Sequence, residues 1–416
     1  MAAIILTVVL LGILIMVHEA GHLLAARWRG VRVERFSVGF GPRIWGFRRG
    51  GTEYLLSAIP FGGYVKMAGD DPEAAEGRPD EFFSRPLSDR FLIILAGPLA
   101  NLALGFLFFF GAGLFGKDYF PGNTVARVKE DSPAQRAGLL PGDRILSVNG
   151  KPFSDWSDVP AGRARIGVLR GQDTVFLEAE SLEGVEPYIP PVLGKTVPGE
   201  PAERAGLMRG DTVLAVDSVA VGTWGEMVEY IRERPGKEIT FTVKRGADTL
   251  RISVLTRAES TLEDGKERSI GMVGVLAPTE RKPVSVPNAL RGALTETLYA
   301  AGFIFFVLLK MITGAISPGS IGGPLMMGKA VGQSWGLGLE RLLATAGLIS
   351  VNLCVVNLLP IPALDGGHLT IFSLEGIIRR RIPPKWHTRI QLAGLVLVGL
   401  LMVVVTLMDI RKLFLR

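Results

Sequence analysis

The sequence predicts a multi-pass α-helical membrane protein with a membrane-associated β-hairpin or sheet and two inserted β-rich modules. Three observations predict this fold class: four long apolar stretches, a glycine-punctuated β-like segment after the first of them, and an internal repeat between the second and the third. Of the 416 residues, 48% are hydrophobic and 21% are charged. That mixture is typical of membrane segments that alternate with soluble domains.

Each of the four apolar stretches approaches or exceeds the ~20 residues that a helix needs to cross ~30 Å of hydrocarbon. They are residues 1–25, 91–115, 342–362 and 390–408. A fifth stretch, 297–309, has only 13 uncharged residues. We therefore expect four transmembrane helices plus one interfacial or re-entrant helix. The first stretch lacks the basic leading region of a secretory signal, so we expect it to be retained.

The charges of the loops predict the orientation of the spans. Residues 27–49 hold seven arginines and one acid, and residues 379–389 hold five basic residues and no acid. Because loops rich in lysine and arginine stay in the cytoplasm, we expect both loops there and the region 116–290 outside. This distribution accounts for the net charge of +6. No basic tract marks a nucleic-acid-binding arm, so we expect no nucleic acid as a partner.

Short β-like runs separated by glycines occupy residues 31–69, within the loop 28–90. The segment lies directly between two spans, so we predict a β-hairpin or sheet at the membrane surface. Its glycine-rich strand 60–67, which contains Gly62 and Gly63, has two interpretations. It is either an edge strand that pairs with an extended substrate or an ordinary surface hairpin.

An internal repeat lies between the second and third spans. Residues 132–150, SPAQRAGLLPGDRILSVNG, recur at 200–218 as EPAERAGLMRGDTVLAVDS, an offset of 68. Each copy places a Gly-Asp turn before a strand of alternating apolar and polar residues, which predicts one β-rich module used twice. Both copies resemble PDZ domains, which implies a groove for an extended peptide such as a C-terminus. The alternative is that the modules, placed at 118–188 and 189–278, act only as spacers or size filters.

The motif HEAGH at residues 18–22 indicates the chemistry. His18 and His22 stand at positions i and i+4 of a predicted helix, so both imidazoles lie on one face and can bind one metal ion. Glu19 lies beside that face, placed to take a proton from a zinc-bound water and pass it to a leaving amine. Such side chains are costly within a membrane helix, so their spacing favours function over an incidental position at a helix end.

A catalytic zinc site has three protein ligands and one open position. The third ligand is sought in NLLPIPALDGGH, residues 357–368, just past the third span. Asp365 is an acid at the membrane border, followed by two glycines that allow a tight turn, and His368 is the rival ligand. The single cysteine, Cys354, excludes a disulfide within the chain and a site of several thiolates, and we interpret it as a buried packing residue.

Three asparagines are further candidates. Asn357 lies eight residues before Asp365, a separation of about two helical turns that would place both at one cavity. It would either hydrogen-bond the substrate backbone or the developing oxyanion, or join helices as a buried polar residue. We interpret Asn101 as a packing residue, and Asn352 is the weaker functional candidate.

HExxH in the first span and a late N-x-x-P-x-P-x-L-D-G motif together resemble the site-2 protease family of intramembrane metalloproteases. The resemblance extends over nearly the whole chain. Within the family, the chain is most similar to the branch of bacterial regulator-of-sigma-E proteases. It includes FSVGFGP at 36–42, PFGGYVKMAG at 60–69, AGPLAN at 96–101 and SVNLCVVNLLPIPALDGGH at 350–368. Two departures, short loops in the first module and Cys354 where glycine is frequent, leave the chemistry untouched.

The resemblance implies one zinc ion per chain, bound by His18, His22 and Asp365, with Glu19 as the catalytic acid and base and His368 in a supporting position. It implies cleavage within transmembrane segments of single-span proteins, such as anti-sigma factors or remnant signal peptides, after a prior external cut. This is regulated intramembrane proteolysis in envelope stress signalling. It further implies a monomer in the bacterial inner membrane, with periplasmic modules and an active site near the cytoplasmic side.

The predicted organisation divides the chain into eight segments. They are the first transmembrane helix with HExxH (1–27), a cytoplasmic loop with the β segment (28–90), the second transmembrane helix (91–117), the two PDZ-like modules (118–188 and 189–278), an interfacial or re-entrant helical region (279–340), the third transmembrane helix with the LDG motif (341–368), and a cytoplasmic loop with the fourth transmembrane helix (369–416).

Two other classes of function stay open at this point. A membrane receptor or scaffold with a structural metal would keep its function after Glu19→Gln, because that change spares the metal ligands. A metal transporter is the other class, and the sparse polar content of the spans gives it little support.

Overall fold

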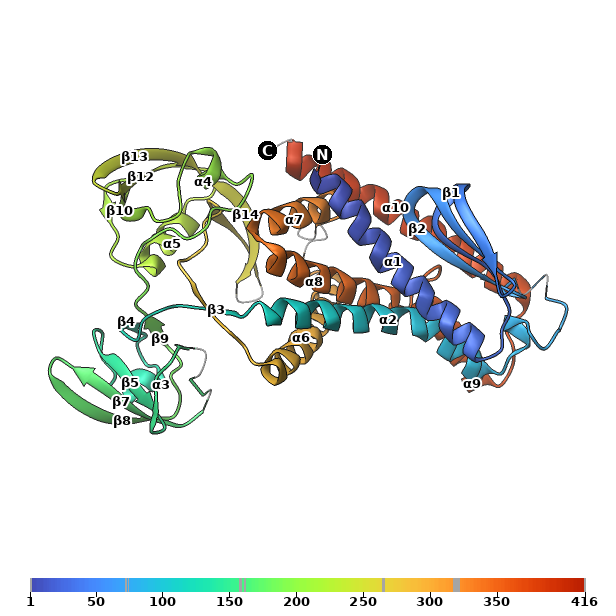
Figure 1. Cartoon of the computed structure of the whole chain (residues 1–416), viewed down its shortest axis with the longest axis horizontal. Helices are drawn as coiled ribbons and strands as arrows, with labels where there is room; N and C mark the ends of the chain where they lie inside the picture. The colour runs from blue at the N-terminus through green and yellow to red at the C-terminus, as the bar shows by residue number, and fades with distance from the viewer. Residues whose placement is uncertain are drawn as a thin grey trace. The chain divides into compact units, whose positions relative to one another are not determined.

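The computed structural model describes residues 2–71, 73, 75–156, 159–160, 162–263, 266–316 and 322–414. The chain forms two compact units. One unit comprises Met1–Phe115 together with Ser285–Arg416, and the other comprises Gly116–Val284. The first unit is mostly helical and the second is mostly β-structure (Figure 1).

Within the described part of the first unit, five helices are long and apolar enough to cross a membrane, judged by length and composition. The chain is therefore a multi-pass membrane protein. These five helices are α1 (Ala2–Trp28), α2 (Leu87–Leu114), α6 (Val286–Ile312), α8 (Leu339–Asn357) and α10 (Pro384–Phe414). The unit also contains the 3₁₀ turn η1 (Phe82–Ser84) and the shorter helices α7 (Pro324–Leu337) and α9 (Asp365–Ile378).

Helix α6 differs from the expectation for residues 297–309. The apolar run alone was too short for a span, but the helix is 27 residues long because it begins at Val286. Its opening turns carry Arg291 and Glu296, which interrupted the apolar pattern without ending the helix. By length, α6 is a fifth candidate span where the sequence predicted four.

The expected segment 341–368, the third transmembrane helix with the LDG motif, is divided between two helices in the structure. Helix α8 ends at Asn357, and Asp365 instead begins the separate helix α9. The chain turns between them with Ala363 at φ +75°. A Cβ atom at Gly366 would lie 2.1 Å from the Leu359 carbonyl oxygen, so only glycine permits this close return of the backbone.

Helix α2 is the central helix of this unit. It packs against α1, α6, α8 and α9, and the teal α2 lies beside the dark-blue α1 in Figure 1. Buried Ser350 of α8 donates a hydrogen bond to the backbone oxygen of Asn101 of α2, at 2.7 Å. Such bonds hold helices together where no water competes for the polar groups.

Strands β1 (Val33–Arg49) and β2 (Thr52–Met67) form an antiparallel sheet in the loop where the sequence predicted a hairpin. Both strands bend back on themselves, so residues 33–38 of β1 pair with 53–56 on one side and with 63–67 on the other. Segment 63–67 is therefore an edge, and no described strand pairs with its outer side. An edge of this kind can pair with a further strand, although the N–H groups of Val65 and Met67 already donate to Glu19 and Asp70.

The second unit contains two four-stranded sheets with the same strand order, β6-β5-β7-β8 and β11-β10-β12-β13. This confirms the β-rich character that the internal repeat predicted. The elements are β3 (Lys117–Tyr119), β4 (Val125–Val128), α3 (Pro133–Arg136), β5 (Arg144–Val148), β6 (Lys151–Pro152), β7 (Ala164–Arg170), β8 (Asp173–Ala179), β9 (Val185–Pro187), α4 (Pro201–Arg204), β10 (Thr212–Val216), β11 (Val219–Ala220), α5 (Trp224–Arg232), β12 (Glu238–Arg245), β13 (Asp248–Leu255), β14 (Arg257–Glu263), β15 (Lys266–Met272) and β16 (Glu280–Lys282).

The Gly-Asp motif plays the same structural part in both repeats. Asp143 is buried and accepts hydrogen bonds from Arg170, and Asp211 is buried and accepts them from Arg245. In each copy the arginine also donates to a loop carbonyl, that of Gly138 or Gly206. A bidentate Arg–carboxylate pair fixes the turn to the third strand of its sheet.

The turn after the repeated strand is also shared, although Asp217 replaces Asn149 there. Both residues adopt the left-handed conformation, with φ of 51° at Asn149 and 54° at Asp217. Each side-chain oxygen accepts a hydrogen bond from a backbone N–H of the neighbouring strand of the sheet, that of Arg165 in β7 or Thr240 in β12. Asparagine and aspartate both tolerate this conformation, so the substitution preserves the turn.

Candidate metal centre

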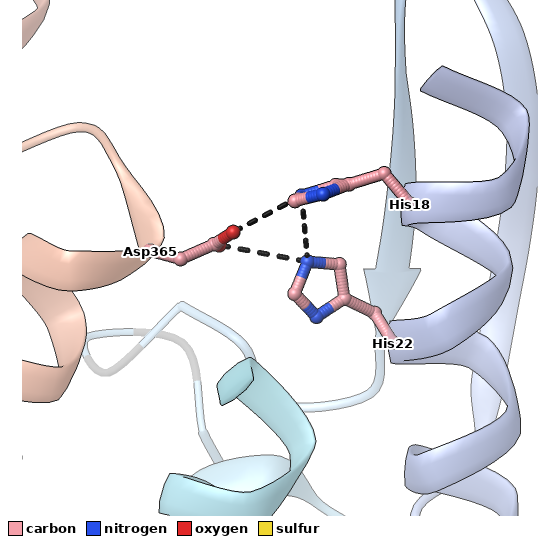
Figure 2. Close-up of side chains that lie close together, drawn as sticks. All are labelled: His18, His22 and Asp365. Atoms are coloured by element: carbon pink, nitrogen blue, oxygen red, sulfur yellow. Dashed lines mark hydrogen bonds and ion pairs between the residues drawn. The ribbon is translucent and has the colours of Figure 1, made fainter. Parts of the chain in front are cut away.

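Helix α1 presents both histidines of the HEAGH motif on one face, as their i and i+4 positions predict. The Nε2 atoms of His18 and His22 lie 3.2 Å apart, and both residues are buried. Figure 2 shows the two rings directed toward the same point from successive turns of α1.

Asp365 reaches this point from the first residue of α9. Its carboxylate oxygens lie 3.0 Å from Nε2 of His18 and 3.5 Å from Nε2 of His22. The three side chains converge although they come from opposite ends of the sequence (Figure 2). Their candidate ligand atoms all lie within 4.8 Å of one another, and within the described residues this is the group of His, Cys, Asp and Glu side chains that could hold a metal.

The second nitrogen of His22 is fixed by helix α2. Nδ1 of His22 donates a hydrogen bond to the Ile93 carbonyl oxygen at 2.9 Å, which leaves the Nε2 lone pair free. The ring fits only because residue 97 is glycine. A Cβ atom at Gly97 would lie 2.2 Å from Nε2 of His22. No local pattern in the sequence indicates this role of Gly97, because it depends on how α2 packs against α1.

Glu19 lies between the histidines and the edge segment 63–67. Its carboxylate accepts a hydrogen bond from the backbone N–H of Val65. Gly63 lies against it, since a Cβ atom there would be 3.2 Å from Cγ of Glu19. A larger side chain would displace the carboxylate, so the glycine-rich strand and the HEAGH helix form one structural assembly.

A cavity of about 390 Å³ collects all seven site residues proposed from the sequence. Its lining comprises Ile15, His18, Glu19, His22, Gly62, Gly63, Tyr64, Val65, Met67, Ile94, Asn101, Leu353, Asn357, Ala363, Leu364, Asp365 and His368. Asn352 and Cys354 are not among these residues, and Cys354 is buried, as its apolar surroundings predicted. A cavity of about 480 Å³ in the second unit lacks histidine and cysteine in its described lining.

His368, the rival ligand, lies one helical turn after Asp365 but outside the converging group. Nε2 and Nδ1 of its ring lie 3.0 and 3.2 Å from the side-chain nitrogen of Gln391 in α10. The ring also packs at an angle against Phe372. These contacts direct His368 toward α10, whereas Asp365 lies with the two histidines in the group that could hold a metal.

The residues fit a bound cation. Two imidazole nitrogens that face each other across 3.2 Å hold at most one proton between them. One oxygen of Asp365, Oδ2, is buried and lies 3.0 Å from Nε2 of His18. A divalent ion among these atoms would satisfy all of them. Two nitrogens and a carboxylate oxygen are the donors that zinc accepts, and three protein ligands leave a fourth position open.

Comparison with known proteins gives a consistent result. The model of peptidase family M50 matches residues 6–401. A putative zinc metalloprotease of Neisseria meningitidis is 35% identical, over 96% of this chain and 97% of the relative. Zinc metalloprotease RasP of Geobacillus kaustophilus is 30% identical, over 98% and 97%. Regulator of sigma-E protease RseP of Escherichia coli is 32% identical, over 89% and 90%.

The family match covers both units, and the relatives are similar over nearly their whole length. The resemblance to the site-2 proteases and the expectation of a peptidase are thereby confirmed. Taken together with the converging histidines and aspartate, these matches show that the chain belongs to peptidase family M50.

Proposed function

We propose that this chain is an intramembrane zinc metalloprotease that hydrolyses peptide bonds within transmembrane segments of single-span membrane proteins. The observation that carries the proposal is the convergence of Asp365 of α9 with His18 and His22. The two histidines and Glu19 belong to α1, a helix apolar enough to span a membrane. The names of the relatives, zinc metalloprotease and regulator of sigma-E protease, support the metal and a role in envelope stress signalling.

His18, His22 and Asp365 would hold one zinc ion, which when bound supplies a water of pKa near ~7 and polarises a carbonyl. Glu19 acts as the general base and then as the general acid. Its carboxylate receives the proton of the attacking water and delivers it to the leaving amide nitrogen.

The substrate has to be extended before it can be cut. In a transmembrane helix each backbone carbonyl is hydrogen-bonded within the helix and shielded from attack. The unpaired edge 63–67 lies next to Glu19 and supports a mode of binding in which the unwound segment adds to the sheet as a strand. Asn357, in the cavity lining, would hydrogen-bond the extended backbone or the developing oxyanion.

The two modules of the second unit act as PDZ-like domains on the outer side of the membrane. The shared strand order and the shared Gly-Asp turns support the PDZ-like assignment, and the arginine-rich loops support the orientation. We propose that the modules restrict access until a first protease has removed the external part of the substrate. Binding of the newly made C-terminus is the alternative use of the same domains.

The proposed setting is a monomer in the inner membrane of a bacterium, with the catalytic cavity toward the cytoplasmic side. The multi-pass character of the first unit and the bacterial relatives support it. Its partners would be the bilayer and single-span substrates of the anti-sigma-factor or remnant-signal-peptide type.

The test is a comparison of wild type with Glu19→Gln, both purified in detergent as full-length protein. Wild type should contain one zinc ion and cleave a model single-span substrate whose external domain is absent. Glu19→Gln should retain the zinc and lose roughly 10²- to 10⁴-fold in rate, because the proton carrier is gone while the ligands remain. Cleavage by Glu19→Gln at the wild-type rate, or a wild type without metal, would refute the proposal.

A further inference from the structure

The two histidines at the metal centre differ in what contacts their second ring nitrogen. Nδ1 of His22 faces a carbonyl oxygen, which can only accept a hydrogen bond, so Nδ1 carries the hydrogen and Nε2 is free to bind metal. Nδ1 of His18 instead faces the side-chain amide of Asn101, at 3.3 Å. An amide has both a donor end and an acceptor end, so this contact decides the tautomer of His18.

The amide of Asn101 is deeply buried, with 1% of the residue exposed. Its nitrogen end lies near His18, and its oxygen, Oδ1, has no hydrogen-bond partner in the described structure. If the nitrogen end donates to Nδ1, the ring hydrogen of His18 must lie on Nε2. Nε2 is the atom of His18 that faces His22 and Asp365, so a hydrogen there would prevent Nε2 from binding a metal.

A half-turn of the amide exchanges its two ends without moving the rest of the side chain. The oxygen of Asn101 then accepts a hydrogen bond from Nδ1–H of His18, and the Nε2 lone pair is available to the metal. Ligating histidines usually donate their other ring hydrogen to an oxygen in this way, which fixes the ring and its tautomer.

We infer that Asn101 is a positioning residue that holds His18 in its metal-binding tautomer by accepting the Nδ1 hydrogen through its side-chain oxygen. This inference rests on the proposed function, because it assigns a role at the same metal centre. From the sequence we expected Asn101 to be a packing residue, but helix packing alone does not require its amide to face an imidazole.

The surroundings of Asn101 fix its backbone as well. The Ser350 hydroxyl of α8 donates to the backbone oxygen of Asn101 at 2.7 Å. The same helix, α2, supplies the Ile93 carbonyl that orients His22. Helix α2 therefore contacts both imidazoles of α1. It orients His22 through the Ile93 carbonyl and His18 through the Asn101 side chain.

The test compares Asn101→Asp, Asn101→Leu and the control Ser350→Ala in the full-length protein. Aspartate keeps an acceptor oxygen and removes the amide donor, and leucine keeps the size and removes both. Ser350→Ala removes the neighbouring interhelical hydrogen bond without touching His18. Zinc dissociation constants from chelator competition are the first measurement, and the absorption spectrum of the Co²⁺-substituted protein is the second.

Asn101→Leu should weaken zinc binding about 10- to 100-fold, the usual effect of losing such a partner. Asn101→Asp and Ser350→Ala should bind zinc as tightly as wild type or more tightly and keep the Co²⁺ spectrum. Equal weakening by aspartate and leucine, or no weakening by leucine, would overturn the inference. If the leucine variant does not fold, Asn101→Asp is sufficient to test the inference. If the Asn101 amide acted as a donor to His18, aspartate would weaken zinc binding; if it acts as an acceptor, aspartate retains zinc. A wild type that binds no zinc would instead overturn the proposed function.

Discussion

Nε2 of His18 lies 3.0 Å from a carboxylate oxygen of Asp365, although His18 belongs to α1 and Asp365 begins α9. The contact depends on the break between Asn357 and Asp365, which ends α8 and redirects the chain toward α1. If α8 continued straight past Asn357, each further residue would advance about 1.5 Å along the helix axis. Asp365 would then lie about 12 Å beyond Asn357 along that axis. The geometry of the metal centre is thus a property of the turn as much as of the ligands.

Asp365→Ala should abolish tight zinc binding, because it removes one of three protein ligands. His368→Ala, one turn later on the same helix, is the matched control and should retain the metal, since His368 contacts Gln391 instead of the ligand group. Zinc content after dialysis, measured by mass spectrometry, distinguishes the two. Metal loss in His368→Ala with retention in Asp365→Ala would reverse the ligand assignment.

Gly97→Ala should disrupt the metal centre by displacing His22, because the new Cβ would lie 2.2 Å from Nε2. A displacement of about 1 Å costs on the order of 10²-fold in rate. Gly111→Ala on the same helix is the control, since its nearest neighbour, a Leu343 side-chain carbon, is at an ordinary 3.5 Å. Cleavage rate and zinc affinity are the measurements. Equal effects of the two substitutions would contradict the steric argument.

Glu375 of α9 forms a buried ion pair with Arg90 of α2, at 3.2 Å, and so ties the helix that carries Asp365 to the centre of the unit. Glu375→Ala should destabilise the protein by about 3–5 kcal/mol, because it leaves the arginine charge buried and unpaired. The double variant Glu375→Leu with Arg90→Leu should recover much of that loss. Thermal unfolding in detergent measures both, and a double variant less stable than Glu375→Ala would contradict the explanation.

The second repeat should lose stability in acid through Asp211. The hydrogen bond from the Arg245 guanidinium holds the pKa of the Asp211 carboxyl below its ordinary value, although burial opposes this. An aspartate in the unfolded chain titrates near ~3.9. The stabilisation is therefore complete above about pH 4 and is lost as the pH falls through the lower pKa of the folded state.

Hydrogen exchange of β10 and β12 in the full-length protein measures this effect. Asp211→Asn, which cannot ionise, should exchange faster than wild type at pH 7, and the difference should shrink as the pH falls below about 4. A constant difference across that range would exclude Asp211 as the source of the acid sensitivity.

Removal of both modules should allow cleavage of a substrate that still carries its external domain. The structure offers a defined excision, because β3 pairs with β16 and brings Tyr119 beside Glu280. Deleting residues 121–278 and joining the ends with a short Gly-Ser linker preserves this ladder. Gel analysis of trimmed and untrimmed substrate measures the result. Continued dependence on trimming would count against a filtering role.

The chemistry of the HEAGH motif followed from local spacing. The i and i+4 positions of His18 and His22 place both rings on one face of any helix, with Glu19 adjacent. The β-rich modules were equally predictable, because the repeat preserves the Gly-Asp turn and the alternating strand. The apolar run 297–309 predicted a helix too short to span the membrane. Polar residues in the first turns of α6 interrupt the apolar pattern, so the length of the helix could not be read from that run.

The sequence by itself determined that two imidazoles lie on one helix face with the Glu19 carboxylate beside it, because helical periodicity acts between neighbours in the chain. It left Asp365 and His368 as rival ligands, and it gave no reason to place Gly97 or Asn101 at the metal centre. Only the tertiary structure decided these points, because they depend on which turn of α2 packs against α1 and where α8 ends. Contacts between distant segments arise from packing, and no local pattern encodes their distances.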